Sequence, residues 1–180
     1  EFRRVLFRSW FFQVSKIKDE RLKMKDKQRV ILLDPQGKTF NQKKAKELSM
    51  NNSNFQNPVG LDDNSQYSTA RDLVRASEVG LRNPIFAKIV STKSIILHDV
   101  SQKSTYNLSN INTLLGEVPG VMGVKTGWTE SARENLVAYI ERDGHKVAIV
   151  VLGSQDRFGE TKELINWIFS NYTWQEVKVF

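Results

Sequence analysis

The spacing of apolar residues changes near residue 94, and this change limits the fold that the chain can adopt. Before it, helix signals dominate, and three helices are expected: Asn41–Leu48, one that begins at Thr69, and Pro84–Ile89. The second helix opens with a capping-box pattern, Thr69 followed by Asp72, and its expected apolar face is Leu73, Val74 and Ala76. Between the first two helices, Asn51–Gln66 is dense in Asn, Asp, Pro and Gly and predicts a loop.

After this point the apolar residues alternate with a period of two, as they do in half-buried strands. The expected strands are Ile95–His98 paired with Thr105–Leu108, then Val121–Thr126, then Asn135–Glu141 and Lys146–Leu152 as a hairpin around Asp143-Gly144. A last amphipathic helix is expected from Gly159 to Phe169, and the residues available to cover the sheet are Leu164, Ile165, Trp167 and Ile168. Helices followed by an antiparallel sheet and a covering helix predict an α+β fold.

The charge of the chain is concentrated at its start. The formal net charge is +7, yet the first 29 residues hold ten Lys and Arg against four Asp and Glu, and the other 151 hold 17 against 16. The basic excess is therefore local, which argues against nucleic acid as a partner. There is no cysteine, which excludes disulfides and thiolate chemistry. No apolar run reaches the length of about 18 residues that a membrane-spanning helix needs.

A cation, a hydroxyl and a glycine follow one another at the end of the strand expected over Val121–Thr126. They are Lys125, Thr126 and Gly127. The lysine supplies a positive field, and the threonine hydroxyl donates a hydrogen bond. The glycine lets a substrate backbone lie against the strand without meeting a side chain. The trio predicts a strand edge that binds a carboxylate, and Lys-Thr-Gly is one of the motifs of β-lactamases and penicillin-binding proteins.

Five further segments accompany this motif in a fixed order. The six are NQKKAKELSMNNSNFQNPVGLDD (Asn41–Asp63), YSTARDL (Tyr67–Leu73), FAKIVST (Phe86–Thr92), NINTLL (Asn110–Leu115), GVKTGWT (Gly123–Thr129) and ENLVAYIERDGHKVAIVVLGS (Glu134–Ser154). With them, the chain from about Asn41 to Trp167 resembles the serine D-alanyl-D-alanine carboxypeptidases, the low-molecular-mass penicillin-binding proteins. The resemblance implies a β-lactamase/transpeptidase-like fold, in which helices flank an antiparallel sheet and the active site lies along the edge of the Lys-Thr-Gly strand.

The resemblance also implies a mechanism. A serine activated by a lysine forms an acyl-enzyme that water then hydrolyses, without a cofactor or a metal. Lys125 and Thr126 match the anchor for the terminal carboxylate of the peptide, Lys125 also assists proton transfer, and Gly127 completes the motif. The backbone N–H of Trp128 matches one oxyanion donor. Arg157 is either a second carboxylate clamp or an ordinary solvated arginine at a helix start.

The partners and location that the resemblance implies follow from this mechanism. The substrate is a peptidoglycan stem peptide ending in D-Ala-D-Ala, and β-lactam antibiotics acylate the same serine. The expected location is extracytoplasmic, in the periplasm or on the outer face of a bacterial membrane, and the mode of membrane attachment is left open. Two alternatives also stay open: a serine β-lactamase of related fold, and a non-catalytic peptidoglycan-binding module.

The beginning of the chain departs from the family. Residues 1–9 look like a translated sequencing adaptor, residues 10–40 form an unmatched basic segment, residues 41–170 form a partial catalytic domain, and residues 171–180 are a linker or the start of a further β domain. The family's Ser-x-x-Lys and Ser-x-Asn motifs are missing upstream of Asn41. We therefore expect the N-terminal part of the fold to be incomplete, and the product to be inactive and prone to aggregation.

Several short motifs are interpreted as coincidences. Ser15-Lys16-Ile17-Lys18 satisfies Ser-x-x-Lys without an apolar helix around it, and Ser49-Met50-Asn51 satisfies Ser-x-Asn at the end of a structural helix. Gly37-Lys38-Thr39 has no glycine five positions earlier, so it does not predict a phosphate loop. His98 and His145 stand alone, without a third ligand at zinc spacing.

Two residues differ from the family inside the matched region. Met122 stands where relatives often have aspartate, and Arg133 stands where a glycine is expected. If that backbone is left-handed, an arginine there costs about 1 kcal/mol or more.

Overall fold

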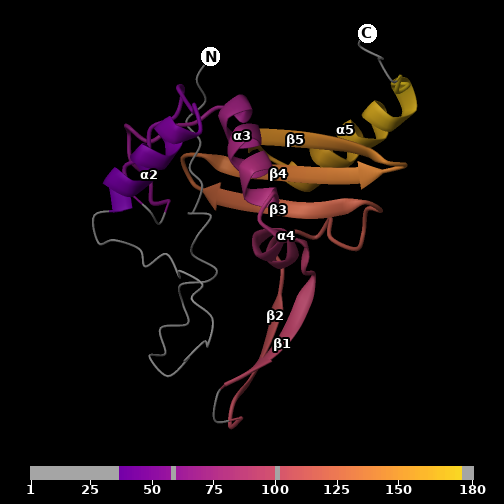
Figure 1. Cartoon of the computed structure of the whole chain (residues 1–180), viewed down its shortest axis with the longest axis horizontal. Coiled ribbons are helices and arrows are strands. Elements are labelled where there is room, and N and C mark those ends of the chain that lie inside the picture. Colours follow the sequence, from indigo (N-terminus) through magenta and orange to yellow (C-terminus); the bar gives the residue numbers. More distant parts are fainter. Residues whose placement is uncertain (1–36, 58–59, 100–101, 176–180) are drawn as a thin grey trace.

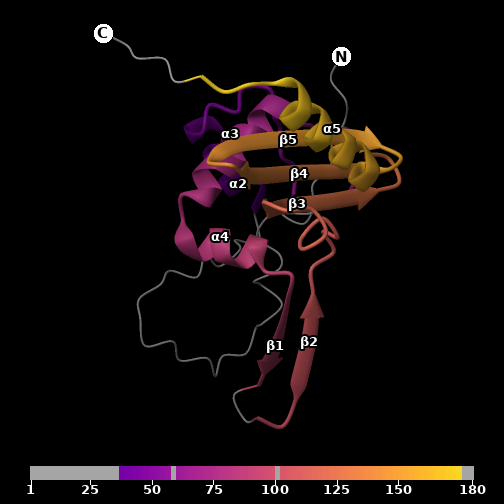
Figure 2. The ribbon, with the colours of Figure 1, turned by 90° about the vertical axis from the view of Figure 1, so that its right-hand side faces the viewer.

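A three-stranded antiparallel sheet forms the centre of the protein. The structure, a computed structural model, describes residues 37–57, 60–99 and 102–175. The strands, in their order across the sheet, are β3 (Val121–Thr129), β4 (Arg133–Arg142) and β5 (His145–Ser154). Helix α5 (Arg157–Asn171) covers one face, and helices α3 (Ala70–Leu81) and α4 (Pro84–Ser91) cover the other, as Figures 1 and 2 show from two sides. The predicted α+β class is confirmed.

Because both faces of the sheet are covered, the central strand β4 is apolar on both sides. Alternate residues along β4 belong to two separate cores. Leu136, Ala138 and Ile140 pack with residues of α5, whereas Val137 and Tyr139 pack with residues of α3 and α4. The turn from β4 to β5 has positive φ at both Asp143 (+53°) and Gly144 (+77°), the conformation that a two-residue hairpin favours.

The predicted strands and helices are present with shifted ends. The hairpin strands are longer than expected by one or two residues at each end, and α5 is longer by two at each end. The helix expected over Asn41–Leu48 is α2, Gly37–Glu47, so it starts earlier and ends one residue sooner. Ser49 follows it with a φ of +55°, in agreement with the interpretation of Ser49-Met50-Asn51 as the end of a structural helix.

The expectation that four apolar residues of α5 cover the sheet is wrong for two of them. Ile165 is completely buried and Ile168 packs beside the same core, but Leu164 is 39% exposed and Trp167 is 51% exposed. Successive residues of a helix are separated by about 100°, so a narrow stripe at i and i+3 covers the sheet and the residue before each one points aside. Thr161, four residues before Ile165, completes the buried stripe.

The loop before α3 is tied to that helix by a buried acid. Thr69 is the N-cap, and its side chain accepts a hydrogen bond from the backbone N–H of Asp72, as the capping-box pattern predicted. The carboxylate of Asp72 is completely buried and accepts from the N–H of Asn52 (2.9 Å) and the hydroxyl of Ser53 (2.8 Å). Leu73 is buried as expected, whereas Val74 and Ala76 are only partly buried.

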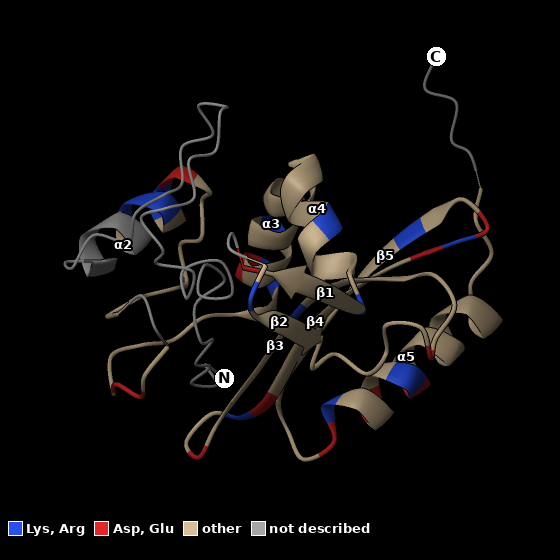
Figure 3. Cartoon of the chain, turned by 90° about the horizontal axis from the view of Figure 1, so that it is seen from below, with Lys and Arg blue, Asp and Glu red and all other residues tan. Residues whose placement is uncertain are grey.

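Helix α4 begins as predicted, with Pro84 in its first turn and Asn83 as its N-cap. It leads into the hairpin of β1 (Ser94–His98) and β2 (Thr105–Ser109), which extends away from the central sheet (Figures 1 and 2). Charges of both signs are distributed over α2, α5 and the β4–β5 turn (Figure 3). Within the described residues, no helix is long and apolar enough to cross a membrane.

Residues 1–36 lie outside the described residues, and so do residues 176–180. The adaptor-like segment, most of the basic segment and the coincidental Ser15–Lys18 motif therefore have no structural description here. The same is true of the second half of the segment expected to be a linker.

Arg133 does occupy a left-handed position. It opens β4 with a φ of +58°, its side chain is exposed, and it pairs with Thr129 at the end of β3. We expect Arg133→Gly to raise the free energy of unfolding by about 1 kcal/mol, because glycine adopts this φ without a steric penalty. Urea denaturation measures the change.

The matched control for this prediction is Arg133→Ala, which removes the charge and keeps the Cβ. We expect it to leave the free energy of unfolding within about 0.5 kcal/mol of the original. An equal gain in both variants would show that the side chain, and not the backbone, is responsible.

Candidate functional site

The predicted carboxylate-binding residues lie on an edge of the central sheet. In the described part of the chain, β3 pairs with β4 and with no second strand. Lys125, Thr126 and Gly127 stand opposite Val137, Leu136 and Asn135 of β4. The other edge of β3 keeps backbone N–H and C=O groups that an extended peptide can pair with.

The motif residues differ in burial. Lys125 is half-buried and its ammonium group donates to the backbone carbonyl of Thr126. Thr126 and Gly127 are buried, whereas Trp128 is 58% exposed. A half-buried cation, a buried threonine and an exposed aromatic ring thus lie within four consecutive residues of one edge strand.

Arg157, at the start of α5, lies next to the Lys-Thr-Gly motif of β3. Its Nη1 donates to the carbonyl oxygen of Gly127 at 3.3 Å, and its guanidinium carbon lies 4.7 Å from the centre of the Phe158 ring. The residue is only 9% exposed. The interpretation of Arg157 as a solvated helix-start arginine is therefore wrong, because the side chain is buried against the end of the Lys-Thr-Gly motif.

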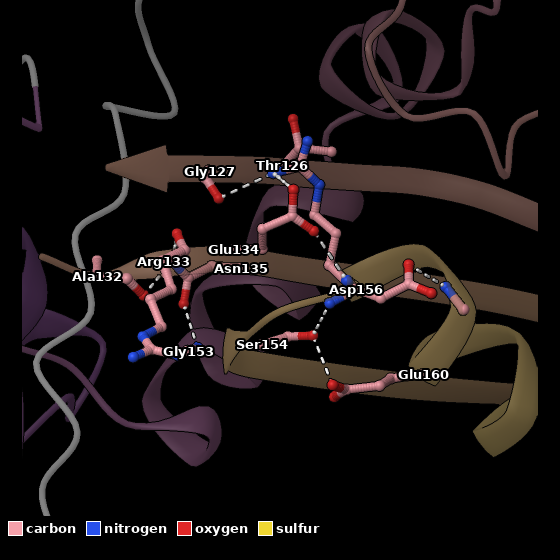
Figure 4. Close-up of polar contacts among 12 residues, drawn as sticks. Thr126, Gly127, Ala132, Arg133, Glu134, Asn135, Gly153, Ser154, Asp156 and Glu160 are labelled. Atoms are coloured by element: carbon pink, nitrogen blue, oxygen red, sulfur yellow. Dashed lines mark hydrogen bonds and ion pairs between the residues drawn. The ribbon is translucent and has the colours of Figure 1, made fainter. Parts of the chain in front are cut away.

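Glu134 of β4 holds Arg157 by two contacts. One carboxylate oxygen accepts the backbone N–H of Arg157 at 3.1 Å, and the other lies 3.7 Å from Nη1. Figure 4 shows Glu134 beside Thr126 and Gly127, where the ends of the three strands meet the start of α5. Sequence reasoning did not single out Glu134, because the two contacts join residues 23 positions apart and no local pattern reports such a pair.

Further hydrogen bonds fix the strand ends around this pair (Figure 4). Asn135 is completely buried, accepts the N–H of Gly153 (2.9 Å) and donates to the carbonyls of Ala132 and Arg133. Its amide therefore connects β4 to β5 and closes the turn after β3. Sequence reasoning also missed Asn135, since a polar residue inside an apolar strand shows its role only when its partners are known.

The start of α5 is fixed in the same way. Ser154 donates to Glu160 (2.7 Å) and accepts the N–H of Asp156 (2.8 Å), and Asp156 caps the helix by accepting from Gly159 (2.9 Å). These bonds fix the first turn of the helix, and with it the backbone that carries Arg157. A signal for this start was present in the sequence, since aspartate is a favoured N-cap residue.

The other polar motifs lie elsewhere. His98 contacts the hydroxyl of Thr105 in the projecting hairpin, and His145 stacks on Trp174 with ring centres 4.6 Å apart. Within the described residues, no group of three His, Cys, Asp or Glu side chains is arranged to hold a metal ion.

Comparison with known proteins shows which family the chain belongs to. Residues 38–156 match the family model described as D-alanyl-D-alanine carboxypeptidase. The chain belongs to this family. Among curated carboxypeptidases, DacF of Bacillus subtilis is 33% identical over 133 residues, which are 72% of this chain and 34% of the relative. DacC of Escherichia coli is 33% identical over 132 residues, which are 69% of this chain and 31% of the relative.

Solved structures of carboxypeptidases and transpeptidases agree with the fold. The DD-transpeptidase of Streptomyces K15 gives a TM-score of 0.66 at 29% identity, covering 72% of this chain and 52% of that one. A D-alanyl-D-alanine carboxypeptidase of Mycobacterium tuberculosis gives 0.67 at 27% identity, covering 80% and 57%. The predicted transpeptidase-like fold is confirmed. This carboxypeptidase-family chain spans about a third of the length of the first curated relatives that it matches.

Proposed function

We propose that this chain carries the carboxylate-binding part of a serine D-Ala-D-Ala carboxypeptidase. The observation that carries the proposal is the buried guanidinium of Arg157 at the carbonyl of Gly127, the residue that follows Lys125 and Thr126 in β3. An arginine so placed presents a planar pair of donors to a carboxylate, and the neighbouring lysine adds a second positive charge.

The substrate of this site would be a stem peptide that ends in D-Ala-D-Ala. Its terminal carboxylate would bind Lys125, Thr126 and Arg157, while its backbone lies along the open edge of β3. The N–H of Trp128 would then face the carbonyl under attack as one oxyanion donor. Peptidoglycan lies outside the cytoplasmic membrane, so a protein with this substrate would act there, and β-lactams would bind the same edge.

We further propose that this chain binds the peptide without hydrolysing it. The matched residues 38–156 contain no Ser-x-x-Lys, and the one Ser-x-Asn there is Ser49-Met50-Asn51. Ser49 lies two residues after the last residue of α2 in a left-handed backbone conformation, as expected for a helix end. Without a serine activated by a lysine, the acyl-enzyme does not form.

The test compares two peptides that differ only at the C-terminus, an acyl-D-Ala-D-Ala acid and its amide. We expect the acid to bind more tightly by calorimetry, because only the acid carries the charge that Lys125 and Arg157 would bind. Equal affinity for the two peptides would overturn the proposed site.

A fluorescent penicillin tests the second part of the proposal. We expect no covalent labelling. A stable labelled adduct would show that the chain has a working nucleophile and acts as a carboxypeptidase, and rapid turnover of the penicillin would favour the β-lactamase alternative. Peptide binding without labelling is the result that a non-catalytic binding protein gives.

A further inference from the structure

We infer that Glu134 limits the affinity of the site for carboxylates by holding a negative charge beside Arg157. This inference rests on the proposed function of the Lys-Thr-Gly edge. It assigns Glu134 as a specificity-determining residue, whose negative charge acts on a carboxylate bound at the guanidinium.

The first step is the geometry of the pair. The carboxylate of Glu134 is fixed by its 3.1 Å hydrogen bond to the backbone N–H of Arg157, at the first turn of α5. A carboxylate at a helix N-terminus is favoured there by the partial positive charge of the helix end. Glu134 therefore stays in place whether or not the guanidinium moves.

The second step is the looseness of the ion pair itself. The closest approach between the other carboxylate oxygen and Nη1 of Arg157 is 3.7 Å, which is too long for a hydrogen bond. Nη1 gives its hydrogen bond to Gly127, and Nε is buried without a partner among the described residues. Glu134 thus balances the charge of Arg157 without occupying its donors.

The third step is the effect on a ligand. An incoming carboxylate can bind the guanidinium without breaking a hydrogen bond to Glu134, but it must approach a like charge. The side chains of Arg157 and Glu134 are only 11% and 29% exposed, so water screens this repulsion incompletely. The terminal carboxylate of the peptide is such a ligand, so the charge of Glu134 weakens the binding of the peptide acid.

The experiment replaces Glu134 by glutamine, which keeps an oxygen that can accept the N–H of Arg157 and removes the charge. We expect Glu134→Gln to bind the acyl-D-Ala-D-Ala acid about three- to tenfold more tightly, with no change for the amide. If the role of Glu134 were purely structural, the substitution would weaken the binding of both peptides. A gain for the acid alone therefore separates an electrostatic role from a structural one.

The matched control is Glu141→Gln. Glu141 lies on the same strand and also faces its cation, Lys146, at 3.7 Å, but at the other end of β4. This variant changes the net charge equally, and we expect less than about a twofold change in acid affinity because the site lies far from it.

The outcomes distinguish this inference from the proposed function. If the original protein prefers the acid and Glu134→Gln binds it equally or more weakly, the role of Glu134 is overturned and the site stands. If the original protein binds both peptides equally, both are overturned.

A second measurement applies if Glu134→Gln does not fold. The carboxyl ¹³C resonance of Glu134 in the original protein should shift when the acid peptide is added and stay unchanged with the amide. An unchanged resonance at saturating acid peptide would overturn the inference.

Discussion

Ile165→Ala should lower the free energy of unfolding by about 3–4 kcal/mol. Ile165 is completely buried where α5 meets the sheet, and it packs in one cluster with Leu136, Ala138, Ile140 and Ile149. Truncation removes apolar contact and leaves a cavity, since the strands on one side and the helix on the other limit relaxation. Urea denaturation followed by circular dichroism measures the loss.

The neighbouring residue provides the matched control. Leu164 is of the same size, lies on the same helix and is 39% exposed. We expect Leu164→Ala to cost less than about 1 kcal/mol, because it leaves no closed cavity. Equal losses in the two variants would mean that α5 does not pack on the sheet through the stripe that contains Ile165.

The contrast between these two residues shows how much of the fold the sequence could predict. The period of two in the strands, the Asp143-Gly144 turn and the Thr69 cap depend on local preferences, and all three are present. Which apolar residues of α5 face the sheet depends instead on the rotation of the helix about its axis. Leu164 and Ile165 are equally apolar, and only packing separates them.

Some residues of the candidate site could likewise be predicted from the sequence, and others could not. Lys125, Thr126 and Gly127 could be predicted, because they are consecutive and their chemistry is evident from the residue types. The burial of Arg157 could not, since a helix start is normally solvated and its partner Gly127 lies 30 residues away. Glu134 and Asn135 carry no local signal, because their roles are defined by hydrogen bonds between different strands and α5.

Arg157→Lys should weaken binding of the acyl-D-Ala-D-Ala acid by about tenfold or more, although the charge is kept. A guanidinium can donate to Gly127, lie over the ring of Phe158 and still present donors to a carboxylate. An ammonium group is a single point charge and cannot make these contacts together. The affinity for the amide should change little, and calorimetry with both peptides measures the difference.

Arg133→Lys is the control for this substitution, since Arg133 is exposed and lies at the start of β4, the strand that pairs with β3. It should leave both affinities unchanged. If Arg157→Lys kept the full preference for the acid, the planar guanidinium would not be needed to bind the carboxylate. A loss confined to the acid would instead make the planar guanidinium a specific part of the site, and the burial of a charged arginine beside Gly127 would then be explained by ligand binding as well as by the packing of α5.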